Sequence, residues 1–294
     1  MRIFAFALLV SSFVFNLAAV APAADQTGLT FKYSKVEIPG ALENIPYGIN
    51  NAGVIVGEYQ DSTGLYHGYI LQGSNVTTLD DSNGDHTAAE GINPNGTITV
   101  VGCYSDSSGI TRGFLYTAGA YTDVPGPTGA ASSCAMGIND SGVISGYYSN
   151  SSGHIRGFML NNGVYSTLTD PDASTTIGQG INDSNNVAAW WIKKENSRVN
   201  SSVYQPSKKN FTFADVPGSN GTYAWGIDTA GDIAAWWLDG DGIAHGALRI
   251  NGTYHKFDYP HDPTYVYGIN DYSTVVGAYL SSTGAYFGFR ATYK

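Results

Sequence analysis

Three pairs of residues in this sequence are of the types that general acid–base chemistry uses, a base or a cation together with an aspartate. In each pair the basic residue starts one strand-like segment and the aspartate ends the next. The pairs are His67 with Asp80, Arg112 with Asp123, and His245 with Asp258. A catalytic dyad repeated along a chain would serve no single substrate. We therefore interpret them as structural cross-strand pairs, each contributing about 0.2–1 kcal/mol.

Two acidic residues at equivalent positions lack a basic partner. Asp215 is aligned with Ser201, and Glu37 with Phe287, so these two acids are the candidates for a carboxyl group with a perturbed pKa. The sequence contains no G-x-S-x-G, H-E-x-x-H, C-x-x-C or phosphate-loop motif. We predict no catalytic residue and no cofactor.

Residues that could bind a metal ion do not form a ligand set. The D-G-D-G stretch at residues 239–242 supplies fewer oxygen ligands than calcium takes, so a glycine turn is expected there. His86, His255 and His261 lack the spacing of metal ligands and are expected in exposed loops. The sequence predicts no metal site.

These residues belong to a unit that occurs six times. Gly-Ile-Asn, once Gly-Ile-Asp, begins at residues 48, 91, 137, 180, 226 and 268. Each copy continues with a turn such as NNAG, an apolar segment such as VIVGEY, a polar loop and two more strand-like segments. A unit of this kind predicts a four-stranded antiparallel sheet. The units are expected near 41–87, 88–133, 134–176, 177–222, 223–264, and 265–294 together with 29–40.

The last unit stops after three strand-like segments, at FGFRATYK. The missing fourth-strand pattern occurs near the start of the chain, as FKYSKVEIPG at residues 31–40. A sheet divided in this way is complete only if the two segments meet. We predict an all-β fold, a six-bladed β-propeller of four-stranded antiparallel blades closed by the N-terminal strand, as one domain over residues 25–294.

The position directly before Gly-Ile-Asn, here called the channel slot, changes its chemistry from unit to unit. Because the first strand of a propeller blade is innermost, this slot is expected at the central channel. Tyr223 and Tyr265 lie two residues before the slot and share its face of the strand. We predict a ligand site, whose rings and polar groups suit a sugar, made of Tyr47, Glu90, Gln179, Tyr223, Trp225, Tyr265 and Tyr267. The alternative, aromatic side chains that close a narrow channel, stays open.

An aromatic residue ends the second strand of every unit. This packing slot holds Tyr59, Tyr104, Tyr148, Trp191, Trp237 and Tyr279. A ring at the same place in each blade is expected to fill space between blades. The role of Trp236, which precedes the slot, stays undecided.

The N-terminus predicts export of the protein. Residues 1–24 hold one basic residue, an apolar run and an A-x-A-like site, which is typical of a secretory signal peptide. The mature chain is expected to be extracellular or periplasmic, monomeric, and without a membrane span. A net charge of −10 argues against nucleic acid as a partner. Cys103 and Cys134 could form a disulfide after export or stay as buried thiols.

The repeated text GINNAGVIVGEYQDSTGLYHGYIL resembles the bacterial extracellular HAF repeats, named for a His-Ala-Phe signature in the third strand. The Gly-Ile-Asn half matches closely, whereas the signature half departs, reading HGY, RGF, RGF, HGA and FGF. The resemblance covers about residues 31–294 and implies an exported, propeller-like protein, but no established activity.

Together these features predict a secreted, non-catalytic binding protein with a glycan as its ligand. Two alternatives remain at this stage. The first is an extracellular protein-interaction module, which would use broad loop surfaces. The second is an extracellular hydrolase or lyase, which would need two carboxylates, or a carboxylate and a histidine, near the channel mouth.

Overall fold

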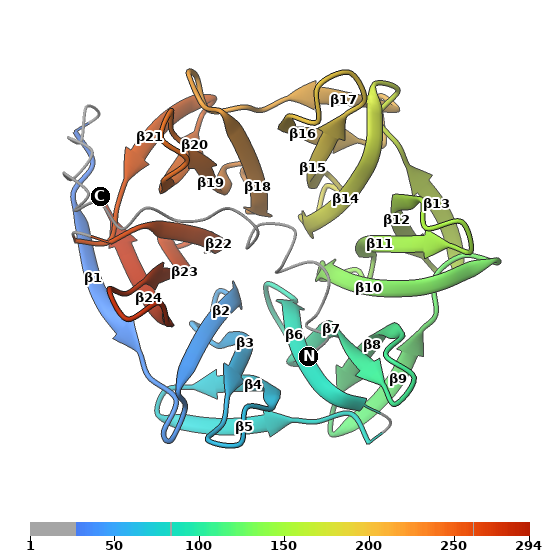
Figure 1. The fold of residues 1–294 in the computed structure, drawn as a ribbon, viewed down its shortest axis with the longest axis horizontal. Coiled ribbons are helices and arrows are strands. Elements are labelled where there is room, and N and C mark those ends of the chain that lie inside the picture. Colours follow the sequence, from blue (N-terminus) through green and yellow to red (C-terminus); the bar gives the residue numbers. More distant parts are fainter. Residues whose placement is uncertain (1–27, 83, 261) are drawn as a thin grey trace.

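The chain folds into a six-bladed β-propeller. The computed structural model describes residues 28–294 except 83 and 261, so the expected signal peptide and His261 lie outside the described residues. Six four-stranded sheets stand around a central channel (Figure 1). The predicted fold is confirmed. No helix in the described part of the chain is long and apolar enough to cross a membrane.

The strands follow one another through the blades in chain order. Blades one and two consist of β2 (Glu43–Ile49), β3 (Ile55–Gln60), β4 (Tyr66–Gln72) and β5 (Asn75–Leu79), then β6 (Gly84–Ile92), β7 (Thr99–Asp106), β8 (Thr111–Thr117) and β9 (Ala120–Val124). Blades three and four consist of β10 (Ala130–Ile138), β11 (Ile144–Asn150), β12 (Ile155–Asn161) and β13 (Val164–Leu168), then β14 (Ala173–Ile181), β15 (Val187–Lys193), β16 (Val199–Gln205) and β17 (Asn210–Phe213). Blades five and six consist of β18 (Gly221–Ile227), β19 (Ile233–Leu238), β20 (Ala244–Ile250) and β21 (Thr253–Phe257), then β22 (Thr264–Asn270), β23 (Thr274–Leu280), β24 (Tyr286–Tyr293) and β1 (Phe31–Val36).

The first strand of the chain closes the ring. β1 pairs antiparallel with β24, in a register that runs from Phe31 opposite Tyr293 to Val36 opposite Gly288. Beyond the ladder, Thr30 and Lys294 exchange two backbone hydrogen bonds of 3.2 Å. The sixth blade is therefore built from both ends of the described chain, as the truncated last repeat predicts.

The first strands of blades two to four begin earlier than the unit boundaries expected near 88, 134 and 177. They start at Gly84, Ala130 and Ala173. Each of these strands has nine residues, because pairing with the second strand continues back to the preceding turn. Repeats aligned on Gly-Ile-Asn locate the middle of a blade better than its edge.

The asparagine of Gly-Ile-Asn joins neighbouring blades. In blade three, Asn139 Oδ1 accepts hydrogen bonds from the backbone of Ser141 and Val143, which fixes the following turn. Its Nδ2 donates to the carbonyl of Asn182 in blade four at 3.0 Å. Asn270 Nδ2 donates in the same way to Asn50 O at 3.0 Å, across the closure of the ring. In these blades the asparagine is a joint between neighbours, whereas Asn93 Nδ2 donates within its own turn, to Thr97 O.

A β-bulge at the channel slot directs its side chain into the channel. In blade three the pairing passes from Ala135 to Gly137 and skips Met136, and the register is also irregular at this point in the five other blades. A bulge leaves one residue unpaired and re-aims its side chain. Opposite the bulge in blade two the backbone passes closely, since a Cβ on Gly102 would lie 2.0 Å from Ala88 O, whereas blades four and five carry Ala189 and Ala235 at this position.

Candidate functional site

The channel-slot side chains form a layer across the central channel. The rings of Tyr47 and Trp225 are stacked with centroids 6.1 Å apart, and Tyr267 meets them edge-on at 5.3 and 4.7 Å. Trp225, Tyr267 and Tyr47 come from blades five, six and one, which follow one another around the ring, so their rings form a continuous aromatic arc on this side of the channel.

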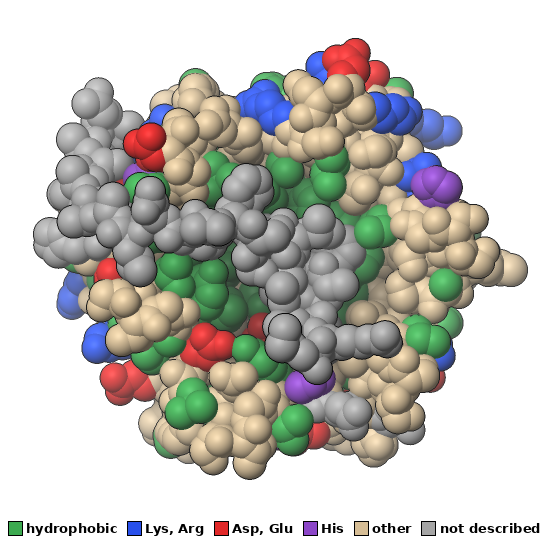
Figure 2. Space-filling model, viewed as in Figure 1, with side chains coloured by type: hydrophobic (Ala, Val, Ile, Leu, Met, Phe, Trp, Pro, Cys, Tyr) green, Lys and Arg blue, Asp and Glu red, His purple; other side chains and the backbone are tan. Residues whose placement is uncertain are grey.

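A cavity of about 140 Å³ lies against one side of this layer. A smaller one of about 70 Å³ lies on the side of the Gly-Ile-Asn turns. All seven residues predicted to bind a ligand line the larger cavity, here called the channel cavity. Figure 2 shows hydrophobic side chains gathered around the centre of the ring on the face viewed. The predicted residues thus meet around one hollow of the channel.

The walls of the channel cavity are aromatic residues paired between the first and second strands. Tyr223 on β18 lies opposite Trp236 on β19, and their rings stack with centroids 3.7 Å apart and planes 8° apart. Trp190 meets Tyr223 edge-on at 5.6 Å, and Tyr265 meets Trp236 edge-on at 5.2 Å. The result is a wall of flat rings from blades four to six.

Two carboxyl groups also line the channel cavity. Tyr47 donates its hydroxyl hydrogen to Glu58 Oε1 at 2.7 Å. Burial raises the pKa of Glu58 to about 7, although the Tyr47 hydrogen bond acts in the opposite direction. Burial, with a smaller contribution from Glu58, raises the pKa of Glu90 well above its usual value. Both acids are therefore far weaker here than in water.

Several enclosed polar atoms of the cavity lining have no hydrogen-bond partner within the described residues. Two are acceptors, Glu90 Oε2 and Gln179 Oε1, and two are donors, Trp225 Nε1 and Trp236 Nε1. Gln179 is 1% exposed and Trp236 is 3% exposed. A buried polar group without a partner costs about 1–3 kcal/mol. Such groups in one cavity are open to partners that water or a ligand can supply.

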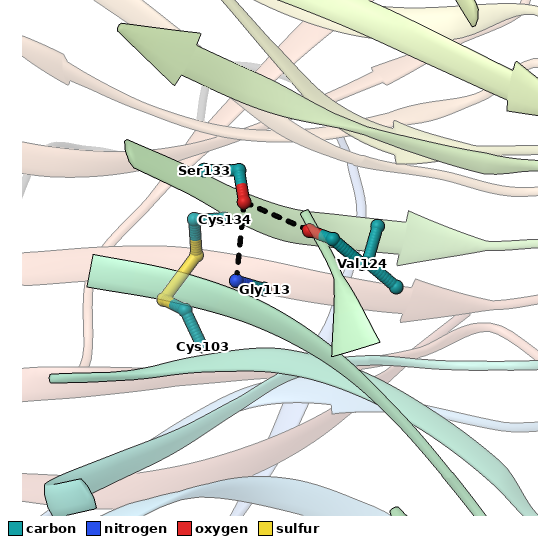
Figure 3. Close-up of a disulfide and its surroundings, with 5 residues drawn as sticks. All are labelled: Cys103, Gly113, Val124, Ser133 and Cys134. Carbon is teal, nitrogen blue, oxygen red and sulfur yellow. Dashed lines mark hydrogen bonds between the residues drawn. A yellow bond between two sulfur atoms is a disulfide. The ribbon is translucent and has the colours of Figure 1, made fainter. Parts of the chain in front are cut away.

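A disulfide forms part of the same wall. Cys103 on β7 and Cys134 on β10 are bonded, with Cα atoms 5.0 Å apart, and so link blades two and three. Beside the bond, Ser133 Oγ donates to Val124 O at 2.8 Å and accepts from Gly113 N at 3.3 Å (Figure 3). A carboxylate oxygen of Glu90 and the two sulfur atoms lie within 4.8 Å of one another, a spacing at which three ligands could hold a metal ion. Because the sulfurs are bonded to each other, they are not available as thiolate ligands.

Two of the predicted histidine–aspartate pairs are present. Nδ1 of His67 lies 2.7 Å from Asp80 Oδ1, and Nδ1 of His245 lies 2.8 Å from Asp258 Oδ2. His67 Nε2 also lies 3.3 Å from Asp61 Oδ2, and His245 Nε2 lies 3.3 Å from Asp239 Oδ2. Both aspartates belong to the preceding loop and are not among the predicted partners. These pairs hold the polar loop between the second and third strands, outside the channel cavity.

The predicted pairing of Arg112 with Asp123 is wrong. Arg112 Nε instead donates to Asp106 Oδ2 at 2.9 Å. Asp106 occupies the loop position of Asp61, and its other oxygen accepts hydrogen bonds from the backbone of its own turn. The register of β8 and β9 places Asp123 opposite Phe114 rather than Arg112, and Asp123 lies 3.4 Å from the hydroxyl of Tyr104.

The expectation that Asp215 lacks a cationic partner is also wrong. Arg198, from the insertion in blade four, lies 3.1 Å from Asp215 Oδ2, and Ser201 N donates to Oδ1 at 2.6 Å. Burial nevertheless raises the pKa of Asp215 to about 6. Glu37, the other candidate, is exposed just after β1. Neither acid lines the channel cavity, so the two candidate carboxyl groups are not brought together.

The cavity wall also contains residues that the sequence did not predict. Glu58, Tyr147, Trp190, Trp236 and Tyr286 all line the channel cavity. Four of these occupy the position before the packing slot on the second strand, which holds Glu58, Cys103, Tyr147, Trp190, Trp236 and Ala278. Its chemistry varies as much as that of the channel slot, and that variation was the available signal. Trp237, by contrast, stacks on His245 at 4.8 Å and lies under Lys256.

Comparison with known proteins gives likenesses of structure alone. No protein-family model and no curated protein sequence matches this chain. A putative TolB from Agrobacterium tumefaciens is similar with a TM-score of 0.59 and 12% identity, over 90% of this chain and 98% of that one. The Aleuria aurantia lectin in complex with Fucalpha1-6GlcNAc is similar with a TM-score of 0.53 and 13% identity, over 87% and 96%. At such identities the likeness supports the six-bladed fold only.

Proposed function

We propose that this protein is an exported, non-catalytic sugar-binding propeller that holds one sugar ring in the channel cavity. The observation that carries the proposal is the stacked pair of Tyr223 and Trp236 beside enclosed donors and acceptors without partners. Aromatic faces suit the apolar face of a sugar, and the polar atoms suit its hydroxyl groups. The Aleuria aurantia lectin, a propeller of similar architecture, is in complex with a fucose-containing disaccharide, which is compatible with this role.

The size of the channel cavity limits the ligand. Its volume of about 140 Å³ is close to that of an engineered apolar cavity of about 150 Å³ that accepts one benzene. The cavity therefore takes no more than one six-membered ring, and longer chains would have to enter by a terminal unit. Export, implied by the N-terminal sequence, is part of the proposal and is tested by locating the protein in fractionated cells.

A matched pair of neighbouring tryptophans tests the site. Trp236 lines the channel cavity, whereas Trp237 packs against His245 outside it. Trp236→Phe keeps a ring but removes the Nε1 donor, so we expect at least tenfold weaker sugar binding, about 1.4 kcal/mol. Trp237→Phe should leave the Kd within twofold. Binding is measured by saturation-transfer NMR titration after a glycan array has identified sugars, and thermal unfolding checks both folds.

Two outcomes would contradict the proposal. One is a glycan array and a monosaccharide panel that both give no signal with the wild-type protein. The other is an equal loss of binding in the two tryptophan variants, which would place the ligand elsewhere or indicate general damage.

A glycosidase or lyase is the competing function, because Glu58 and Glu90 line one cavity. Such enzymes use one carboxyl group as an acid and keep another ionised as a base or nucleophile. Here burial raises the pKa of both groups, and the cavity lining holds no cation that would keep either one ionised. The environment favours binding over catalysis. Release of nitrophenol from a panel of nitrophenyl glycosides, lost in Glu90→Gln, would reverse this conclusion.

A further inference from the structure

The channel cavity has acidic groups and no basic ones. Its described lining includes Glu58 and Glu90 but no lysine, arginine or histidine. Buried acids in proteins are generally paired with a cation or fully hydrogen-bonded. Glu58 has the Tyr47 hydroxyl as a donor, whereas Glu90 Oε2 has no partner. The cavity therefore lacks a donor at Glu90.

A second acceptor points to the same missing donor. Gln179 occupies the channel slot of blade four, is 1% exposed, and its Oε1 atom has no partner. It lines the channel cavity together with Glu90. Two unpartnered acceptors in one cavity lining suit a ligand group with several hydrogens to donate. An ammonium group has three donors and no acceptor.

The aromatic residues of the channel-slot layer also favour a cation. Tyr47, Trp225 and Tyr267 contact one another in the same layer as Glu90. The faces of such rings attract cations, most strongly when water is excluded. A neutral hydroxyl group would satisfy the acceptors but would gain nothing from the ring faces or from an ionised Glu90.

We infer that the sugar held in the channel cavity is an amino sugar, whose protonated amine donates to Glu90 Oε2 and Gln179 Oε1. The inference rests on the proposed function for the sugar ring and adds the charged group. The donors Trp225 Nε1 and Trp236 Nε1 are left for the ring's hydroxyl oxygens.

Binding of the amine is coupled to the loss of a proton. Burial raises the pKa of Glu90 and so favours its protonated form in the empty cavity, whereas the ammonium ion favours the carboxylate. The Glu90 carboxyl O–H bond breaks, its proton goes to the buffer, and the carboxylate pairs with the ammonium group. The charged or titratable groups that face Glu90 are Glu58 and the phenols of Tyr47, Tyr147 and Tyr267, which stay neutral because burial raises their pKa values as well.

Three probes separate the amine from the ring. Methyl glucoside has hydroxyl groups and no charge, its 2-amino-2-deoxy counterpart has both, and cyclohexylamine has the charge alone. For the wild-type protein we expect the amino sugar to bind at least tenfold more tightly than methyl glucoside. Glu90→Gln should reduce this preference to less than threefold while methyl glucoside still binds. Glu195→Gln, at an exposed residue, is the control and should behave like the wild type.

Calorimetry gives a readout that does not depend on a variant that folds. Titrating the wild-type protein with the amino sugar in phosphate and in Tris should show release of a proton, absent with methyl glucoside. Equal affinity of the two sugars would overturn the amino-sugar inference and leave the proposed function intact. A preference that persists in Glu90→Gln would overturn the assignment of Glu90. Binding of cyclohexylamine without either sugar would overturn the proposed function while supporting the amine contact.

Discussion

The stability of the protein should depend on pH through Glu58. Its pKa is 4.5 in the absence of the fold and about 7 in it, because the side chain is buried. Between these pH values the folded state keeps the proton and the unfolded state releases it, so the free energy of unfolding falls as pH rises. The shift from 4.5 to about 7 corresponds to a loss of about 3 kcal/mol between pH 4 and pH 8.

Glu58→Gln removes this titration and keeps an acceptor for the Tyr47 hydroxyl. Relative to the wild type, the variant should therefore gain about 3 kcal/mol of stability between pH 4 and pH 8. Urea unfolding at both pH values gives the double difference, in which groups that titrate equally in both proteins cancel. Glu195→Gln, whose carboxylate is exposed beside Lys193, should give no double difference. Parallel stability curves for the wild type and Glu58→Gln would refute the reasoning.

Four further variants test the packing of the ring by urea unfolding. Replacing Cys103 and Cys134 with alanine opens a 31-residue loop and should lower stability by about 3–4 kcal/mol; reduction of the wild type should have a comparable effect. Gly102→Ala puts a methyl group 2.0 Å from a backbone carbonyl oxygen and should cost about 1–3 kcal/mol, and a neutral result would contradict the bulge geometry. Burial lowers the pKa of His245, but its two aspartate contacts raise it above 6.5 overall. The contacts of protonated His245 therefore stabilise the folded state at low pH, and this contribution is lost as pH rises through the folded-state pKa. His245→Asn should cost about 2 kcal/mol at pH 6, and His67→Asn, at a more exposed pair, less than about 1 kcal/mol; equal costs would count against the role of burial.

The fold could be predicted from the sequence because the same strand pattern is repeated in every blade. Repetition of Gly-Ile-Asn fixes the number of blades, and the divided last unit fixes the closure. The channel slot was also recognisable, since residues such as Glu90 and Trp225 differ in chemistry while their position is constant. What the repeat cannot give is the depth of each side chain in the channel.

The errors arose where the strand register or an insertion decides a contact. Alignment placed Arg112 opposite Asp123, but the register puts Asp123 opposite Phe114, and Arg112 pairs with the loop acid Asp106. Alignment also gave Asp215 no cation, because Arg198 lies in an insertion that the other blades lack. The role of Trp236 could not be assigned, because the alternation of side chains along a strand does not identify which of the two faces lines the channel.

The closure of the ring has a consequence for the order in which the protein can form. β1 is among the first strands to be synthesised, yet its partner β24 is the last in the described chain. Until β24 exists, β1 has no strand to bind and its hydrogen-bonding edge stays open. Five blades pair segments that are neighbours in the sequence, whereas the sixth needs both β1 and β24. Closing the ring therefore depends on a single long-range pairing.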